Sequence, residues 1–171
     1  MGGKCPSSIH ATCVVVGEAG VLIRGESGAG KSSLARALIE RATLQGVFAA
    51  LVGDDRVRLA AAHGRIVARP HPAIVGLIEI RGHGLVAMDC VAACVLRLVV
   101  DLAEGGPRLP DSVEDAATIL GIALPGLRID RAVRDAGHGP GLVMAKLRDA
   151  YPSVSSQSHT PLPVRRTPPA P

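Results

Sequence analysis

The chain has 171 residues, of which 47% are hydrophobic and 20% are charged, so it can form one domain with a buried core and is too apolar to be disordered throughout. Aromatic residues make up 1% of the chain, with one Phe, one Tyr and no Trp, which excludes surfaces that stack nucleic-acid bases on aromatic rings. The net charge of +4 is spread along the sequence without a basic run, so we expect no nucleic-acid partner.

The first half of the chain alternates short apolar segments with turns. Residues 9–16 (IHATCVVV) are rich in β-branched side chains and predict a strand. After the glycine-rich loop, the apolar side chains of residues 32–43 recur with the period of a helix. The other predicted strands are 21–24, 47–52 and the two halves of a hairpin, 56–62 and 65–68.

The second half is less regular. Residues 77–80 (LIEI) predict a strand, and residues 91–102 fit either a helix or a strand, of which we favour a strand from Cys94. A Gly/Pro loop at 103–112, a short helix at 113–120 and a last helix at 142–150 are expected after it. We therefore expect one domain at 1–150 and a disordered tail rich in Ser, Thr and Pro at 151–171.

The cysteines and the apolar segments indicate where the protein resides. Cys5, Cys13, Cys90 and Cys94 lack the CxxC spacing of zinc sites, and no signal peptide precedes them, so we expect buried thiols in a reducing compartment. No apolar segment reaches the roughly 18 residues that a membrane span requires. We expect a soluble, cytoplasmic protein without a membrane partner.

The most informative motif precedes the first predicted helix, where residues 25–32 read GESGAGKS and match G-x-x-x-x-G-K-[ST]. Glycines let the backbone curl so that its N–H groups point at phosphate oxygens, and the helix that begins here adds free N–H groups and a positive dipole end. The Lys is expected to reach the β- and γ-phosphates and the Ser hydroxyl to bind Mg²⁺. The predicted nucleotide-binding residues are Gly25, Glu26, Ser27, Gly28, Ala29, Gly30, Lys31 and Ser32.

Two adjacent carboxylates, Asp54 and Asp55, follow the strand predicted at 47–52. Many P-loop proteins place an Asp after an apolar strand to hold the Mg²⁺ shell. Because neighbouring side chains at the end of a strand point to opposite faces, we expect one carboxylate to face the metal and the other to face an acceptor hydroxyl as a general base. A simple turn before Arg56 is the alternative.

Four stretches together resemble the catalytic domain of the HPr kinase/phosphorylase family. They are residues 9–11 (IHA), 25–32, 51–57 (LVGDDRV) and 77–85 (LIEIRGHGL). The fourth is similar to the family's E-I-R-G-x-G signature and is the most specific, since a P-loop alone does not single out the family. Its signature positions after the Glu are Ile80, Arg81, Gly82 and Gly84.

The resemblance implies an α/β fold, namely a compact P-loop kinase domain of the PEP carboxykinase-like type with a mixed β-sheet core and flanking helices. It implies ATP and Mg²⁺ as cofactors. His10 would be a catalytic histidine near the phosphates, and Lys31 would contact them. Asp55 would take the proton of a seryl hydroxyl, and Arg108 is the match to a later catalytic arginine.

The resemblance also implies a metal site. Ser32 and Glu79 would organise Mg²⁺, together with Asp54, which the carboxylate pair described above assigns to the metal. Glu79 lies in an apolar stretch, and because a lone buried carboxylate is costly, we expect it to be paired or at a site. Arg81 is expected either to contact the phosphates or to serve as a structural ion-pair partner.

The implied activity is phosphorylation of a serine of HPr, the phosphocarrier of the sugar phosphotransferase system, with phosphate-dependent dephosphorylation as the reverse reaction. The family's N-terminal domain is absent, so we expect the short form. Residues 123–131 read ALPGLRIDR where the family has Pro-Gly-Arg-Asn, which weakens the case for the reverse reaction. The family also implies a homo-oligomer, usually a hexamer.

Two other functions stay open. A P-loop kinase of small molecules is disfavoured because no lid or acceptor motif is recognisable. A non-catalytic regulator that senses nucleotides is the other, and it is disfavoured because Asp55 and Glu79 are both present. A GTPase is disfavoured by the lack of an N-K-x-D motif.

Overall fold

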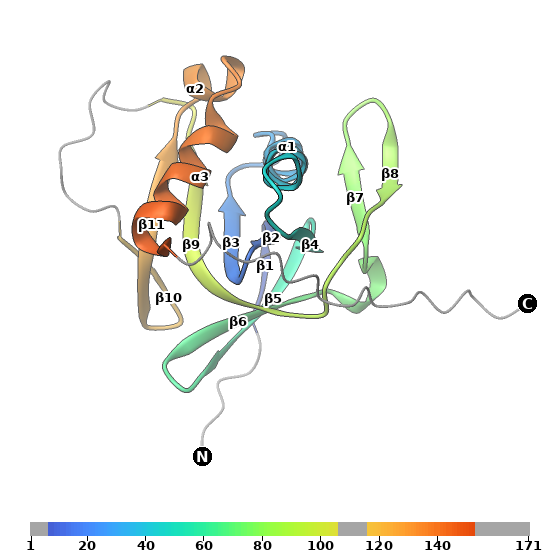
Figure 1. The fold of residues 1–171 in the computed structure, drawn as a ribbon. Coiled ribbons are helices and arrows are strands. Elements are labelled where there is room, and N and C mark those ends of the chain that lie inside the picture. Colours follow the sequence, from blue (N-terminus) through green and yellow to red (C-terminus); the bar gives the residue numbers. More distant parts are fainter. Residues whose placement is uncertain (1–6, 106–115, 153–171) are drawn as a thin grey trace, which may run out of the picture.

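The computed structural model describes residues 7–105 and 116–152. Arg108, Cys5 and all but the first two residues of the expected tail lie outside the described residues. Within them the chain forms a large mixed sheet, a separate two-stranded sheet and three α-helices (Figure 1). None of the helices in the described part has the length and apolarity needed to cross a membrane.

The large sheet has the strand order β1-β5-β6-β9-β3-β2-β4, with β11 beside β9 and β10 beside β11. The β3–β9 and β9–β11 pairs are parallel, and the other pairs are antiparallel. The strands are β1 (Ser7–His10), β2 (Thr12–Val16), β3 (Ala19–Arg24), β4 (Ala49–Gly53), β5 (Arg56–Ala62), β6 (Arg65–Pro70), β9 (Cys94–Leu102), β10 (Ala116–Ile119) and β11 (Ile122–Ile129).

Strand β9 connects the two halves of this sheet. Its first residues, Cys94 and Val95, pair with β6, whereas its later residues lie between β3 and β11. The strand beyond Cys94 that the sequence predicts is therefore confirmed. The two-stranded sheet of β7 (Leu77–Ile80) and β8 (Gly84–Ala87) lies beside α1, on the side away from α3 (Figure 1).

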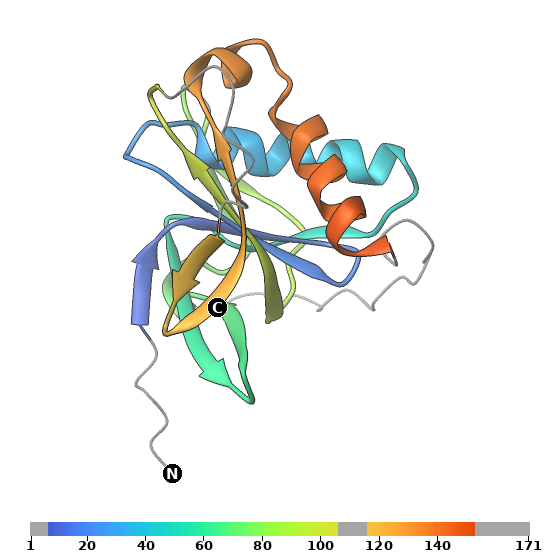
Figure 2. The ribbon, with the colours of Figure 1, turned by 90° about the vertical axis from the view of Figure 1, so that its left-hand side faces the viewer.

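The helices cover one face of the sheet, and the buried hydrophobic residues form two separate cores. Helix α1 (Lys31–Leu44) and helix α3 (Gly139–Ala150) lie side by side on that face, and the short α2 (Arg131–Asp135) and the 3-10 turn η1 (Pro72–Ile74) are connectors (Figure 2). One core lies between the helices and the sheet, and α1 contributes Leu34, Leu38 and Ile39 to it with the predicted helical period. The second core lies between strands β2, β3 and β4 and the β5–β6 hairpin of the same sheet.

The buried thiols belong to the second core. Cys13 and Cys94 are buried with their Sγ atoms 3.7 Å apart, and Cys90 is half-buried. Burial raises the pKa of the Cys13 thiol well above its ordinary value. The expectation of buried, apolar cysteines is thus confirmed for Cys13 and Cys94.

Two predictions of secondary structure are wrong. Residues 9–16 are not one strand, because the chain breaks at Ala11 into β1, which pairs with β5, and β2, which pairs with β3 and β4. The helix expected at 113–120 is a strand where the structure describes it, since β10 pairs with β11 across a two-residue turn. Leu120 and Gly121 in that turn have φ values of 50° and 81°, as type I′ hairpins require.

Candidate phosphate-binding and catalytic site

The predicted phosphate loop lies between the end of β3 and the start of α1. Gly28 and Gly30 have φ values of 80° and 90°, a conformation that residues with a side chain rarely adopt, so glycine is required for this curl. Gly30 is the N-cap of α1 and brings no capping side chain. The first N–H groups of the helix are therefore available to an anion.

Lys31, the first residue of α1, is almost buried at the base of this loop. Its Nζ donates to the carbonyl oxygens of Gly25 at 3.0 Å and Glu26 at 2.9 Å. Burial lowers its pKa, and the nearby carboxylates of Asp54 and Asp55 partly oppose that shift. The loop carbonyls accept hydrogen bonds from this ammonium but carry no net charge. A bound phosphate group would supply the negative charge.

His10 joins Lys31 to Asp55. Its Nε2 lies 2.9 Å from Lys31 Nζ, and its Nδ1 lies 3.0 Å from Asp55 Oδ1. An ammonium group only donates, so Nε2 accepts, the ring proton is on Nδ1, and Nδ1 donates to the carboxylate. The three residues, predicted from separate motifs, therefore form one chain of polar contacts.

Asp54 and Asp55 point into different environments, as expected for the pair. Asp54 is buried, whereas the Asp55 side chain is 58% exposed. The cause is a γ-turn rather than simple strand alternation, because Arg56 N donates to Asp54 O at 2.7 Å and Asp55 has a φ of 61°. Such backbone strain in a non-glycine residue is typical of functional positions.

The Asp54 carboxylate is held by three donors. Thr12 Oγ1 donates at 2.6 Å, Ser32 Oγ at 2.9 Å to each carboxylate oxygen, and the backbone N–H of Glu79 at 3.0 Å. Ser32 and Asp54 thus place two hard oxygen ligands beside the phosphate loop, which fits Mg²⁺ bound through one or two protein oxygens and nucleotide phosphates. Thr12 is a site residue that the sequence motifs did not indicate.

Glu79 differs from its expectation. Its side chain is exposed, because β7 buries only Ile78 and half-buries Leu77 and Ile80. The premise that this carboxylate is buried is wrong, and the contact of Glu79 with the site runs through its backbone N–H. A role of its carboxylate at the metal stays a prediction.

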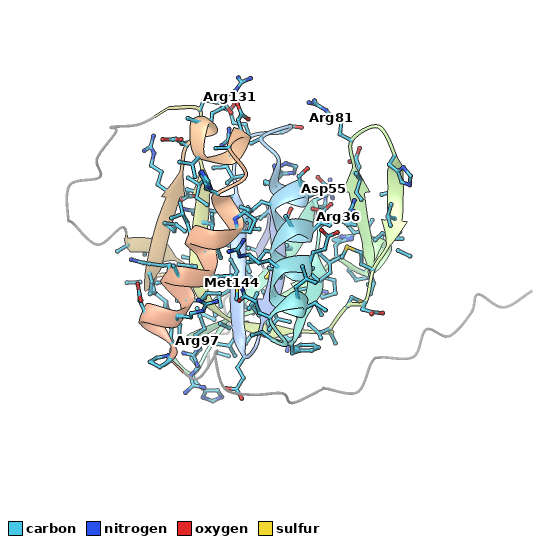
Figure 3. The ribbon with its side chains drawn as sticks, turned by 45° about the horizontal axis from the view of Figure 1, so that its top comes forward. Arg36, Asp55, Arg81, Arg97, Arg131 and Met144 are labelled. Carbon is cyan, nitrogen blue, oxygen red and sulfur yellow. The ribbon has the colours of Figure 1, made fainter. Side chains whose placement is uncertain are left out.

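Arg81 begins the turn between β7 and β8, and Gly82 in that turn and Gly84 at the start of β8 have φ values of 78° and 86°. The Arg81 guanidinium lies over the phosphate loop, with Nη2 3.4 Å from where a Cβ on Gly28 would be. It forms no ion pair with the described residues, so the geometry favours a phosphate contact over a structural pair. Figure 3 shows Arg81 and Arg131 on opposite sides of the N-terminal end of α1.

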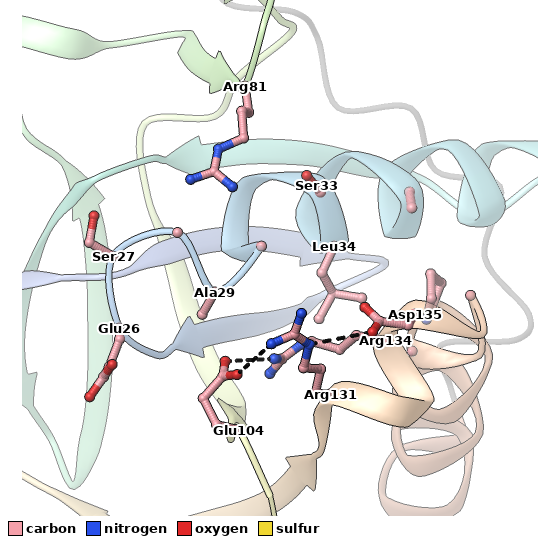
Figure 4. A pocket seen from close by; sticks show the side chains of 16 residues that line it. Glu26, Ser27, Ala29, Ser33, Leu34, Arg81, Glu104, Arg131, Arg134 and Asp135 are labelled. Carbon is pink, nitrogen blue, oxygen red and sulfur yellow. Dashed lines mark hydrogen bonds and ion pairs between the residues drawn. The ribbon is translucent and has the colours of Figure 1, made fainter.

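A cavity of about 670 Å³ opens between the phosphate loop and the start of α2 and α3. Its far wall carries Glu104, which pairs with Arg134 at 2.9 Å and with Arg131 at 3.6 Å (Figure 4). None of these three residues lies in a motif that the sequence shows. The sequence signal for the helix that carries both arginines is Asp130, whose side chain caps α2 by accepting from Val133 N.

Comparisons with known proteins agree with this geometry. Residues 5–100, more than half of the chain, match the HPr serine kinase C-terminal domain. HPr kinase/phosphorylase of Mycoplasma mycoides is 42% identical over 76 residues, which are 44% of this chain and 22% of that protein. The protein of the same name from Streptococcus thermophilus is 38% identical over 93 residues, 53% of this chain and 28% of that protein.

The chain thus matches about a quarter of the length of these curated relatives. A solved structure of HPr(Ser) kinase/phosphatase from Coxiella burnetii aligns with a TM-score of 0.66 at 26% identity, covering 84% of this chain and 98% of that chain. The α/β fold with a mixed sheet and flanking helices is thereby confirmed. The chain belongs to the HPr serine kinase C-terminal domain family.

Proposed function

We propose that this chain is an ATP- and Mg²⁺-dependent protein-serine kinase whose acceptor is HPr or an HPr-like phosphocarrier. The observation that carries the proposal is the chain of contacts Lys31–His10–Asp55, which connects the phosphate loop to an exposed carboxylate. The names of the relatives support the substrate. A cytoplasmic location and a homo-oligomer are parts of the same proposal.

The loop and the start of α1 bind the phosphates in this proposal. Backbone N–H groups of residues 25–32 surround the β- and γ-phosphates, and Lys31 exchanges its loop carbonyls for phosphate oxygens. Ser32 and Asp54 would hold Mg²⁺, which when bound supplies charge that offsets the phosphate oxygens. Arg81 adds a cation from above the loop, and Arg108, outside the described residues, is a further candidate.

Asp55 acts as the general base. A seryl hydroxyl gives its proton to the Asp55 carboxylate as its oxygen bonds to the γ-phosphorus, and the bond from that phosphorus to the β–γ bridging oxygen breaks. His10 donates from Nδ1 to the same carboxylate and so fixes the direction in which Asp55 points. The exposure of Asp55 leaves room for a protein substrate.

Phosphate-dependent dephosphorylation would use the same groups: an oxygen of inorganic phosphate bonds to the phosphorus of phosphoserine, the bond from that phosphorus to the serine oxygen breaks, Asp55 returns a proton to that oxygen, and pyrophosphate leaves. Residues 123–131, which lack Pro-Gly-Arg-Asn, belong largely to β11. The forward reaction is therefore the main activity that we propose, and phosphate-dependent dephosphorylation is the weaker part of the proposal.

The test uses the whole chain with radiolabelled ATP, Mg²⁺ and HPr, and measures phosphoserine. Asp55→Asn is expected to reduce transfer by about 10²- to 10⁴-fold, the usual contribution of a general base, while a fluorescent ATP analogue still binds. Asp149→Asn, an exposed carboxylate on α3, is the matched control and is expected to transfer normally.

Three results would contradict the proposal. Phosphoryl transfer by Asp55→Asn at the rate of the unaltered protein would show that Asp55 is not the general base. ADP release that responds to metabolites but not to HPr would favour the small-molecule kinase. Tight ATP binding by folded protein without any turnover would favour the nucleotide-sensing regulator.

A further inference from the structure

The outer face of the three-stranded segment β1-β5-β6 is basic. Arg56 and Arg58 of β5 and Arg65 and Arg69 of β6 all project from this face, and we call these four residues the basic strip. Arg56, Arg65 and Arg69 are exposed and Arg58 is half-buried. Figure 2 shows the hairpin extending from the body of the molecule with β1 beside it.

The strand register places the four arginines on one side. Directly paired residues in an antiparallel sheet point to the same face, and here Arg58 pairs with Arg69 and Ala62 with Arg65. The intervening side chains, among them Val57, Leu59 and Ile66, point the other way into the second core. Packing of that core therefore holds the basic strip outward.

The strip has no counter-charge in the described part of the molecule. None of its arginines takes part in an ion pair or a side-chain hydrogen bond between residues that the structure describes. Arg58 and Arg69 are direct cross-strand neighbours, and like charges in that position are destabilising. An anionic partner would remove this repulsion.

The strip begins at the reaction centre. Arg56 follows Asp55 in the chain and pairs across the strands with His10, which contacts Asp55. From Arg56 the strand runs six residues to Ala62 at the hairpin tip, about 20 Å at the rise of a β-strand. An extended segment of about six residues can therefore lie along the strip with one end at Asp55.

We propose that the basic strip binds an acidic segment of the protein substrate, adjacent to the serine that receives the phosphoryl group. This inference rests on the proposed function, because it takes Asp55 to be the point where the acceptor hydroxyl enters. A serine at Asp55 would place the following or preceding carboxylates within reach of Arg56, Arg58 and Arg69. The arginine forks match carboxylates in pairs.

A protein segment fits this surface better than a nucleic acid does. The residues that share the face with the four arginines are Ser8, His10, Ala60, Ala62 and Val67, and they offer no Phe, Tyr or Trp ring on which bases could stack. The strip also ends at the Asp55 carboxylate, which would repel a continuous polyanion but accepts the proton of a hydroxyl. The nucleic-acid alternative is one outcome of the test.

The test measures binding without nucleotide, so it does not depend on phosphoryl transfer. The probe is a fluorescein-labelled peptide of one serine and six glutamates, followed by fluorescence anisotropy at low salt. Arg58→Gln/Arg69→Gln is expected to weaken binding about 2- to 30-fold, as expected for the loss of two charge contacts at the surface. Binding by the unaltered protein is expected to weaken with added salt.

The matched control is Arg36→Gln/Arg148→Gln, which changes net charge equally on the helical side, where Arg36 bonds Glu40 and Arg148 bonds Gln45. It is expected to change the affinity less than twofold. If the strip variant does not fold, as judged by circular dichroism, two other variants replace it. Arg65→Gln at the hairpin tip is expected to weaken peptide binding, whereas Arg58→Lys/Arg69→Lys is expected to keep most of it.

Several results would overturn the inference. One is that the unaltered protein does not bind the peptide. Another is that the strip variant and the control variant lose equal affinity for the peptide. A third is that a thymidine 20-mer binds through the strip more tightly than the peptide does. Phosphorylation of HPr without peptide binding would contradict the role proposed for the strip and would still support the proposed kinase. Strip-dependent peptide binding without any phosphoryl transfer to HPr would support the role of the strip and contradict the proposed kinase activity.

Discussion

Thr12→Val tests whether Asp54 depends on its hydrogen-bond donors. Thr12 is fully buried, and its hydroxyl donates to Asp54 Oδ1 at 2.6 Å. Valine has nearly the same shape, so the substitution removes the hydroxyl and leaves little empty volume. The Asp54 carboxylate keeps the Ser32 hydroxyl and the Glu79 N–H as donors.

The expected loss follows from the charge of the acceptor. A hydrogen bond to a charged group contributes about 1.5 to 3 kcal/mol to the free energy of unfolding, more than a bond between neutral groups. For a domain of this size each kcal/mol lowers Tm by about 2 to 4 °C. We therefore expect Thr12→Val to unfold about 3 to 12 °C below the unaltered protein.

Urea unfolding and thermal unfolding without nucleotide measure this effect, so the result does not depend on catalysis. Thr43→Val is the control, because Thr43 is an exposed residue of α1 whose hydroxyl bonds the neutral carbonyl of Ile39, and Thr and Val have similar helix propensities. A loss below about 0.5 kcal/mol in Thr12→Val, or one no larger than in Thr43→Val, would refute the reasoning.

Two further predictions concern the interior and the phosphate loop. Gly20→Ala would place a Cβ 2.6 Å from both Cys94 Sγ and Val95 O, so we expect a loss of about 1 to 3 kcal/mol in urea unfolding, against almost none for Gly105→Ala, where the space is open. Burial lowers the pKa of Lys31, so the unfolded protein binds that proton more readily. The stability of the unaltered protein relative to Lys31→Met should therefore rise as the pH increases towards about 10.4, the pKa of an unperturbed lysine. A relative stability that is flat or falls over this range would contradict the shift.

The parts of the site that lie within short motifs are predictable from the sequence. The GESGAGKS loop and the pair Asp54 and Asp55 each carry their chemistry in adjacent residues, and the structure places Lys31, Ser32 and Asp54 together. Long-range placement is less predictable. The burial of Glu79 was misjudged because an apolar stretch does not show that its strand pairs with only one neighbour, β8.

The basic strip shows the same limit for charge. One apolar residue separates Arg56 from Arg58 and three separate Arg65 from Arg69, so no basic run appears in the sequence. A strand period of two sends alternate side chains to one face, and the hairpin register then adds the two strands together. A surface with a clear charge is therefore invisible until the pairing of β5 and β6 is known.

The break at Ala11 explains how two adjacent aspartates come to have different surroundings. His10 ends β1, which pairs with β5 on one side of Asp55, and Thr12 begins β2, which pairs with β4 on the other side of Asp54. His10 then contacts the exposed Asp55, and Thr12 bonds the buried Asp54. In a continuous strand at 9–16, His10 and Thr12 would lie in the same ladder and on the same face, so both would lie beside the same neighbouring strand. The change of partner strand at Ala11 is therefore what separates the proposed base from the proposed metal ligand.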